Sequence, residues 1–321
     1  MNFNLPQDYA EVDKVVILGM GGSAIGGDLV SSLAISEAKL PIIVSRSYDL
    51  PAFTDAKTLV IASSYSGNTE ETVSSFEQAL KTKAKKLVIT TGGKLKAMAE
   101  GSSVPVFSFD YKAQPRTALP FSFVPILCFL QRLGFVGDKS QDVTETVDVL
   151  KHLSQRITEG MPLSHNPAKQ LANRLYNHLP VIYGAGIVSE VAHRWKTQLN
   201  ENSKAWSFYE VFPELNHNAV VGYQFPGELA SRIAVVLLNS TVLPKRIQLR
   251  YQVTCQLLDQ AKVSYQIVDG SGQSPLSQIM SLVLFGDYVS YYLAMLYKID
   301  PSPVKAIDFL KERLAQAKEN K

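Results

Sequence analysis

Cysteine is scarce in this sequence, and so is any excess of charge of one sign. It contains 2 cysteines, and Cys128 and Cys255 each lie among apolar residues, a setting typical of core packing rather than of a disulfide, a metal site or a nucleophile. The net charge is only +3 and is evenly spread, which argues against a nucleic-acid-binding surface. The densest basic run, at 81–86, is expected to be the solvated end of a helix.

A long hydrophobic run is missing as well. The longest apolar stretch, 118–130, contains Pro120 and Pro125 and is too short to cross a bilayer core about 30 Å thick. The first residues show neither a basic start nor an apolar segment, so no signal peptide is expected. These features predict a soluble, cytoplasmic protein with no membrane and no nucleic-acid partner. A length of 321 residues with 46% hydrophobic residues suits two globular domains of about 150 residues each.

The stretch 58–80 predicts an anion-binding loop. Val and Ile at 58–62 indicate a short buried strand, and the apolar positions within 73–80 indicate a helix. Asn68 is the expected N-cap of that helix, with Glu71 as its capping-box partner. The loop between them carries the hydroxyl groups of Ser63, Ser64, Ser66 and Thr69. Backbone N–H groups and the positive end of the helix dipole would favour an anion there, although Ser and Gly also make an ordinary strand-to-helix connection.

An earlier strand, at 15–18, opens into a glycine-rich turn at 19–27 and a helix that is expected to reach about residue 34. Such a turn lets a phosphate approach the backbone closely. Its spacing also fits a dinucleotide-binding fingerprint, but the next strand, 41–45, ends without an acidic residue for a ribose. Arg46 would suit a 2′-phosphate, so an NADP-linked oxidoreductase stays open. The second hydroxyl-rich loop at 63–69 argues against it, because a dinucleotide fold does not need a second anion site.

The rest of the first half continues the alternation of strands and helices. Strands are expected at 86–90 and 104–107 and a helix at 121–134. Arg116 lies between two prolines in a stiff loop, which favours a positioned guanidinium over a solvated charge. The polar helical stretch that follows is interrupted at 160–162, which places the predicted domain boundary between 1–160 and 161–321.

The second half repeats this order. A strand and glycine turn at 180–186 precede a helix at 189–200, and further strands are expected at 233–238 and 265–268. We therefore predict two copies of one α/β unit, each with a mainly parallel sheet flanked by helices. The second copy lacks the Gly-Gly-Ser and hydroxyl-rich sequences, so one phosphate site is predicted, in the first half.

Several motifs resemble the bifunctional phosphoglucose/phosphomannose isomerases of the phosphoglucose isomerase superfamily. They are Gly-Met-Gly-Gly-Ser at 19–23, Ser-Tyr-Ser-Gly-Asn-Thr at 64–69, Pro-Arg-Thr-Ala-Leu-Pro at 115–120, Asn-Glu-Asn-Ser-Lys at 200–204 and Glu-Leu-Asn-His-Asn at 214–218. The resemblance covers nearly the whole chain and implies two sugar isomerase (SIS) domains of αβα sandwich type. It also implies interconversion of fructose 6-phosphate with glucose 6-phosphate and mannose 6-phosphate through a cis-enediol, without a metal or cofactor.

The resemblance assigns roles to four further side chains. Glu201 matches the base that moves a proton between C1 and C2, and Arg116 matches the residue that stabilises the enediolate. His217 and Lys311 match the residues that open the sugar ring. In the superfamily the corresponding His comes from the partner subunit, so a homodimer with shared active sites is implied. Spacing leaves Glu210 and Glu214 open as rival bases.

The same resemblance assigns the substrate's phosphate to the first half. The implied ligands are the hydroxyls of Ser23, Ser64, Ser66 and Thr69 and the backbone N–H groups of Gly21 and Gly22. Mannose activity needs room for rotation about C2–C3, and either Ser302 or Val304 would form the base of that pocket. A non-catalytic SIS module that senses a sugar phosphate remains the alternative.

Overall fold

The computed structural model describes residues 3–319 and divides into two compact units. The first unit ends at Glu145 and the second begins at Thr146, within helix α5, Ser140–Ile157. The units therefore divide earlier in the chain than the expected break at 160–162, which lies in the turn after α5. Helical periodicity cannot reveal a division that falls inside one continuous helix.

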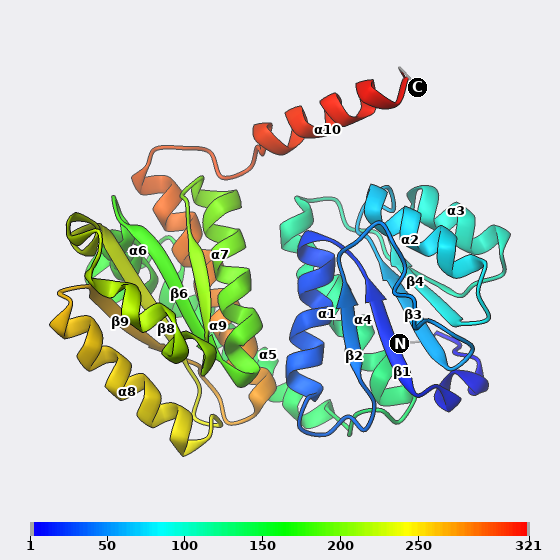
Figure 1. Ribbon diagram of the computed structural model, residues 1–321, viewed down its shortest axis with the longest axis horizontal. Helices are drawn as coiled ribbons and strands as arrows, with labels where there is room; N and C mark the ends of the chain where they lie inside the picture. The colour runs from blue at the N-terminus through cyan, green and yellow to red at the C-terminus, as the bar shows by residue number, and fades with distance from the viewer. Residues whose placement is uncertain (1–2, 320–321) are drawn as a thin grey trace. The chain divides into compact units, whose positions relative to one another are not determined.

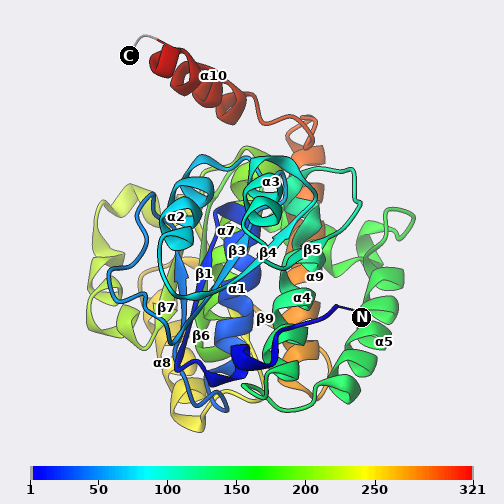
Figure 2. The ribbon, with the colours of Figure 1, turned by 90° about the vertical axis from the view of Figure 1, so that its right-hand side faces the viewer.

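The first unit contains a parallel five-stranded sheet in the order β2-β1-β3-β4-β5 (Figure 1). Its strands are β1 Lys14–Leu18, β2 Ile42–Ser45, β3 Thr58–Ser63, β4 Lys85–Thr90 and β5 Val106–Ser108. The central strand β3 is buried along its whole length, as its Val- and Ile-rich sequence predicts. Figure 2 shows β5 beside β4 at one edge of this sheet.

Helices cover both faces of this sheet. They are α1 Gly21–Ala34, α2 Glu70–Leu80, α3 Gly93–Gly101 and α4 Leu119–Arg132. Phe76 of α2 and Leu95 of α3 share one apolar core with Val16 and Val60 of the sheet. On the other face, Gly27 of α1 lies so close to Ile17 that an added Cβ would come within 3.0 Å of its side chain. The predicted αβα sandwich is confirmed for this unit.

The second unit contains a parallel four-stranded sheet in the order β7-β6-β8-β9. Its strands are β6 Leu179–Ala185, β7 Phe208–Phe212, β8 Ile233–Asn239 and β9 Ser264–Asp269. Its helices are α6 Pro167–Leu175, α7 Ser189–Ser203, α8 Lys245–Gln260, α9 Pro275–Leu296 and α10 Lys305–Glu319. The first four strands of each unit follow one another in the same spatial order, which confirms the predicted duplication. The edge strand β7 was not predicted.

Helix α9 is the longest helix of the second unit. By length and composition its 22 residues could cross a membrane, with a mean hydropathy of 1.5 over the tested window. However, 61% of that window is buried, and α9 packs against α6 and α7. It is the core helix of this unit. A core helix and a membrane span are both apolar all round, because each is surrounded by apolar groups on every side.

Candidate active site

The turn after β1 holds the first part of the candidate phosphate site. Helix α1 begins at Gly21, whose φ of +49° is left-handed, and no side chain of the described residues caps this helix end. A Cβ at Gly19 would lie 3.1 Å from the backbone oxygen of Ser63, so the turn runs close to the next strand. Gly21 and Gly22 thus open α1 without side chains of their own and without a side-chain cap, an arrangement that favours an anion.

The loop after β3 is stabilised by its own hydroxyl groups. The Oγ of Ser64 lies 2.9 Å from Oγ1 of Thr69 and accepts the N–H of Gly67 at 3.1 Å. The Oγ of Ser66 accepts the N–H of Asn68 at 3.2 Å. Ser64 is buried, Thr69 is half-buried and Ser66 is exposed. Among the three predicted hydroxyl ligands in this loop, Ser66 is thus the most accessible to a ligand.

Helix α2 begins differently from the prediction. Its N-cap is Thr69, and no described side chain caps the helix, so the predicted capping box of Asn68 and Glu71 is wrong. The side-chain oxygen of Asn68 instead accepts the N–H of Lys94 at 2.9 Å, in the first turn of α3. Sequence spacing could not show this, because the partner lies far along the chain. The first turn of α2 is left without a side-chain cap, as an anion site requires.

The two turns meet at one small cavity of the first unit. The N–H of Tyr65 donates to Oγ of Ser23 at 3.3 Å, which links the hydroxyl loop to the start of α1. Gly22, Ser23, Ser63, Tyr65 and Pro115 lie among the residues that line the cavity. Of the predicted ligands, Gly22 and Ser23 therefore face the same space as Pro115, whereas Gly21, Ser64, Ser66 and Thr69 are not among the residues that line this cavity.

Arg116 lies in the short 3-10 helix η2, Pro115–Ala118, and is only 6% exposed. A Cβ at Gly22 would lie 3.5 Å from the backbone oxygen of Pro115 and 3.8 Å from Cα of Arg116. The structure thus brings Arg116 beside the glycine turn, where a guanidinium is expected to act on a bound anion or oxyanion.

Tyr65 supports the loop that leads to Arg116, a role that the sequence did not reveal. Its hydroxyl lies 2.6 Å from the carbonyl oxygen of Tyr111 and 3.0 Å from that of Ala113, and it accepts the N–H of Ala113 at 3.2 Å. Further along, Oγ1 of Thr117 donates to the carbonyl of Gln114 at 2.8 Å. The stiffness predicted from the two prolines is therefore reinforced by a phenol from the neighbouring loop.

Arg46 has a structural partner. It forms an ion pair with Asp28, which is 8% exposed on α1. The guanidinium that would have held the 2′-phosphate of NADP is thus bound to a carboxylate of its own unit. This removes the observation that kept the oxidoreductase hypothesis open.

The remaining predicted residues all belong to the second unit. Glu201 is half-buried in the last turn of α7, at the negative end of the helix dipole. His217 ends the 3-10 helix η5, Glu214–His217, and is exposed. Lys311 is exposed on α10, where every described side chain from 305 to 317 is exposed.

The rival carboxylates have other surroundings. Glu210 is exposed on β7 beside Tyr183 of β6, whose pKa is raised by burial and, to a smaller extent, by Tyr223 and Glu210. The hydroxyls of Tyr183 and Tyr223 lie 3.0 Å apart, and burial also raises the pKa of Tyr223, so both phenols stay protonated at neutral pH. A carboxylate oxygen of Glu214 accepts the side-chain amide of Asn218 at 2.8 Å.

These features define the class of protein before any family: a duplicated parallel α/β fold of SIS type. Solved structures share the fold. The tagatose-6-phosphate ketose/aldose isomerase from Escherichia coli superposes with a TM-score of 0.68 at 16% identity, covering 92% of this chain and 86% of that one. The C-terminal domain of glucosamine-fructose-6-phosphate aminotransferase from Francisella tularensis superposes with a TM-score of 0.71 at 13% identity, covering 92% of this chain and 88% of that one.

Sequence comparisons define the family. Residues 164–314 match the family model described as bacterial phospho-glucose isomerase C-terminal SIS domain. A bifunctional phosphoglucose/phosphomannose isomerase from Caldicellulosiruptor bescii is 45% identical over 99% of this chain and 94% of its own length. A second enzyme of this name, from Aquifex aeolicus, is 36% identical over 97% of this chain and 93% of its own length. The chain belongs to the bifunctional phosphoglucose/phosphomannose isomerase family, which confirms the resemblance drawn from its motifs.

A more distant relative has a different name. The D-glucosamine-6-phosphate 4-epimerase from Sulfolobus acidocaldarius is 27% identical over 94% of this chain and 89% of its own length. Distant similarity alone therefore does not define the reaction, and the products must be identified chemically.

Proposed function

We propose that this chain is an aldose-ketose isomerase that interconverts fructose 6-phosphate with glucose 6-phosphate and mannose 6-phosphate. The observation that carries the proposal is the buried Arg116 beside the uncapped glycine turn, in a chain 45% identical to a bifunctional phosphoglucose/phosphomannose isomerase. We further propose that it works as a soluble cytoplasmic enzyme of glycolysis and gluconeogenesis, with no metal or cofactor.

The phosphate group is proposed to bind at the starts of α1 and α2. The proposed hydrogen-bond donors are the backbone N–H groups of Gly21 and Gly22 and the hydroxyls of Ser23 and Ser66. The N-termini of α1 and α2 have no side-chain cap, which leaves the positive ends of their dipoles available to an anion. Ser64 and Thr69 are proposed to contribute as well, although their hydroxyls also contact one another. Donors that are already positioned bind a phosphate without costly rearrangement.

Proton transfer is proposed to follow from Glu201 and Arg116. Glu201 takes the proton from C1 or C2, and its place at a helix C-terminus favours the protonated form that the step produces. The guanidinium of Arg116 stabilises the negative charge that develops on the enediol oxygens, and its buried position strengthens that interaction.

Ring opening is proposed to use His217 and Lys311. Both side chains are exposed, so each is available to groups outside its own unit. We propose a homodimer in which His217 reaches the active site of the partner chain. The segment 302–304 before α10 is proposed to supply the pocket base, with Ser302 or Val304 leaving room for both aldose products.

The activity is tested directly with purified protein, EDTA and fructose 6-phosphate, without nucleotide, while the products are followed by NMR. Both glucose 6-phosphate and mannose 6-phosphate are expected. Glu201→Gln is expected to lower kcat by about a thousandfold or more, in the upper range for loss of a general base. Glu210→Gln is the matched control and should keep wild-type kcat. The absence of both aldose phosphates would contradict the proposal.

A further inference from the structure

Lys204 ends helix α7 in a conformation that usually favours glycine. Its φ is 52°, in the left-handed region, and it is the C-cap residue of the helix. It also closes the motif at 200–204, in which only Glu201 has been given a role so far. Lys262 and Lys298 adopt the same conformation after α8 and α9, so any role of Lys204 must come from what its side chain contacts.

The ammonium group of Lys204 joins two carbonyl groups. Its Nζ donates to the backbone oxygen of Glu201 at 2.7 Å and to that of Pro301 at 2.9 Å. The first acceptor belongs to the last turn of α7, where carbonyl groups lack partners within the helix. The second lies in the segment that joins α9 to α10. One side chain therefore ties the residue proposed as the base to Pro301, which directly precedes the segment 302–304 proposed as the pocket base.

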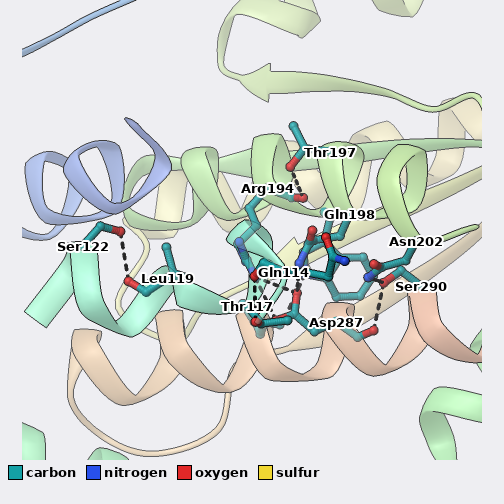
Figure 3. Close-up of polar contacts among 12 residues, drawn as sticks. Gln114, Thr117, Leu119, Ser122, Arg194, Thr197, Gln198, Asn202, Asp287 and Ser290 are labelled. Carbon is teal, nitrogen blue, oxygen red and sulfur yellow. Dashed lines mark hydrogen bonds and ion pairs between the residues drawn. The ribbon is translucent and has the colours of Figure 1, made fainter. Parts of the chain in front are cut away.

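Polar contacts hold the same helix end against α9. The side-chain amide of Asn202 donates to Oγ of Ser290 at 2.9 Å, and Oγ of Ser203 donates to the backbone oxygen of Ser290 at 2.7 Å. Figure 3 shows Asn202 directed at Ser290.

Earlier turns of α7 are fixed to α9 in the same way. A single guanidinium nitrogen of Arg194, Nη2, lies 3.0 and 2.9 Å from the two carboxylate oxygens of Asp287. The amide of Gln198 donates to Asp287 at 2.8 Å, as Figure 3 also shows. Helix α7 is thus anchored to α9 from its middle to its end. Lys204 adds the contact that fixes its last turn to the chain after α9.

We propose that Lys204 is a positioning residue that fixes Glu201 relative to the segment 300–304. This inference rests on the proposed isomerase function. A base must reach both C1 and C2, and a displacement of about 1 Å can cost on the order of a hundredfold in rate. The same contact sets the distance between the base and the pocket base, so it also influences how the enediol is divided between the glucose and mannose products.

A purely structural cap makes a different prediction from a positioning side chain. Glycine has no Cβ to strain in the left-handed region and is the most favourable residue at a helix C-terminus of this kind. If Lys204 only terminates α7, Lys204→Gly should therefore be as stable and as active as the wild type. If the ammonium group positions Glu201, the same substitution should leave stability intact and lower activity.

The test compares wild type, Lys204→Gly, Lys204→Asn and Lys204→Arg, with thermal unfolding, kcat, KM and the ratio of aldose products as readouts. Asn also tolerates the left-handed region, so the two uncharged variants control for one another. We expect both to keep the wild-type unfolding midpoint and KM, to lose about tenfold in kcat and to change the product ratio, while Lys204→Arg recovers most of the kcat. Wild-type kcat and product ratio in Lys204→Gly would overturn the proposal, as would a loss of kcat no larger than the loss of folded protein.

The outcome is separable from that of the proposed function. If the wild type forms no aldose phosphate, or Glu201→Gln keeps full kcat, the assignment of the base fails first. If the wild type is active and Glu201→Gln is inactive, but Lys204→Gly equals the wild type, only the positioning role of Lys204 is wrong.

Discussion

The first four strands of each unit have the same spatial order, but the two units differ in the side chains that contact the turns after their strands. In the first unit the turn after β1 and the loop after β3 leave two helix starts without a side-chain cap. In the second unit the turn after β6 has a similar left-handed glycine, Gly186 with φ +48°, against +49° for Gly21. The backbone of the glycine turn was therefore kept in both copies, and its surroundings changed.

In the second unit, buried side chains pack against the glycine turn and the loop after β8. A Cβ at Gly186 would lie 3.2 Å from the side chain of Leu243, which is buried in the loop after β8. Two residues of this loop donate to the side-chain oxygen of Gln278 on α9. They are Thr241, through its N–H at 3.0 Å, and Ser240, through its hydroxyl at 2.6 Å. Gln278 is fully buried on α9. The loop of the second unit donates to an internal amide, whereas the loop of the first unit bonds to its own hydroxyls and is proposed to bind a phosphate.

The largest expected effect concerns the tight closure of the first unit's loop. Gly67 has φ +67°, and a Cβ there would lie 1.8 Å from the backbone oxygen of Gly92. Gly67→Ala is expected to lower the free energy of unfolding by about 3 to 5 kcal/mol, because backbone must move to relieve the clash. Thermal and urea unfolding measure this. Gly101→Ala, with no heavy atom near the added Cβ, is the control and should change stability by less than about 1 kcal/mol.

The internal acceptor of the second unit gives the next largest effect. Gln278→Ala removes the partner of Ser240 and Thr241 in a fully buried site and is expected to cost about 2 to 3 kcal/mol of stability. The KM for fructose 6-phosphate should not change, since this loop is not proposed to bind substrate. Gln170→Ala, at an exposed amide, should be close to neutral in the same unfolding experiment. An altered KM in Gln278→Ala would show that the second loop also serves the substrate.

Substrate affinity distinguishes the two loops more directly. Ser66→Ala removes a proposed hydrogen bond to the phosphate and is expected to raise KM about tenfold, which corresponds to about 1.4 kcal/mol. Thr241→Ala removes a hydroxyl from the corresponding loop of the second unit and should leave KM at its wild-type value. Steady-state kinetics with fructose 6-phosphate provide the measurement. Equal KM values for the two variants would contradict the proposed division of roles between the loops.

The smallest effect is expected for the phenol that supports the Arg116 loop. Tyr65→Phe removes the hydroxyl that contacts residues 111 and 113 and should lower kcat about threefold, with little change in stability, because one net hydrogen bond is worth only about 1 kcal/mol. Tyr183→Phe removes a phenol that is paired with Tyr223 in the second unit. Tyr183→Phe should lower the free energy of unfolding by about 1 kcal/mol and leave kcat unchanged. Wild-type kcat in Tyr65→Phe would remove Tyr65 from the site.

Local patterns predicted most of the framework. The strands β1, β3, β4, β6, β8 and β9 were located because their Val- and Ile-rich runs end in Gly, Ser or Asn. The duplication followed from their order, and the proposal that two loops bind an anion rests on their glycines and hydroxyls. β7 was missed because Phe208, Tyr209 and Glu210 are exposed on an edge strand, which leaves no buried pattern to recognise.

The details that depend on distant partners could not be predicted. Asn68 was expected to cap its own helix but contacts Lys94, and Tyr65 was not expected to support the loop of Arg116. The contact of Lys204 with Pro301 joins residues that are far apart in the sequence. In each case the choice between a local and a distant partner depends on tertiary packing, about which spacing carries no information.

The most direct test of the proposed chemistry follows deuterium at carbon. Fructose 6-phosphate is incubated in D₂O with wild-type protein or with Glu201→Gln, and exchange at C1 and label at C2 of the aldose products are followed by NMR. We predict deuterium at C2 of both glucose 6-phosphate and mannose 6-phosphate with the wild type, and neither exchange nor product with Glu201→Gln. Exchange at the wild-type rate in Glu201→Gln would show that another group removes the proton.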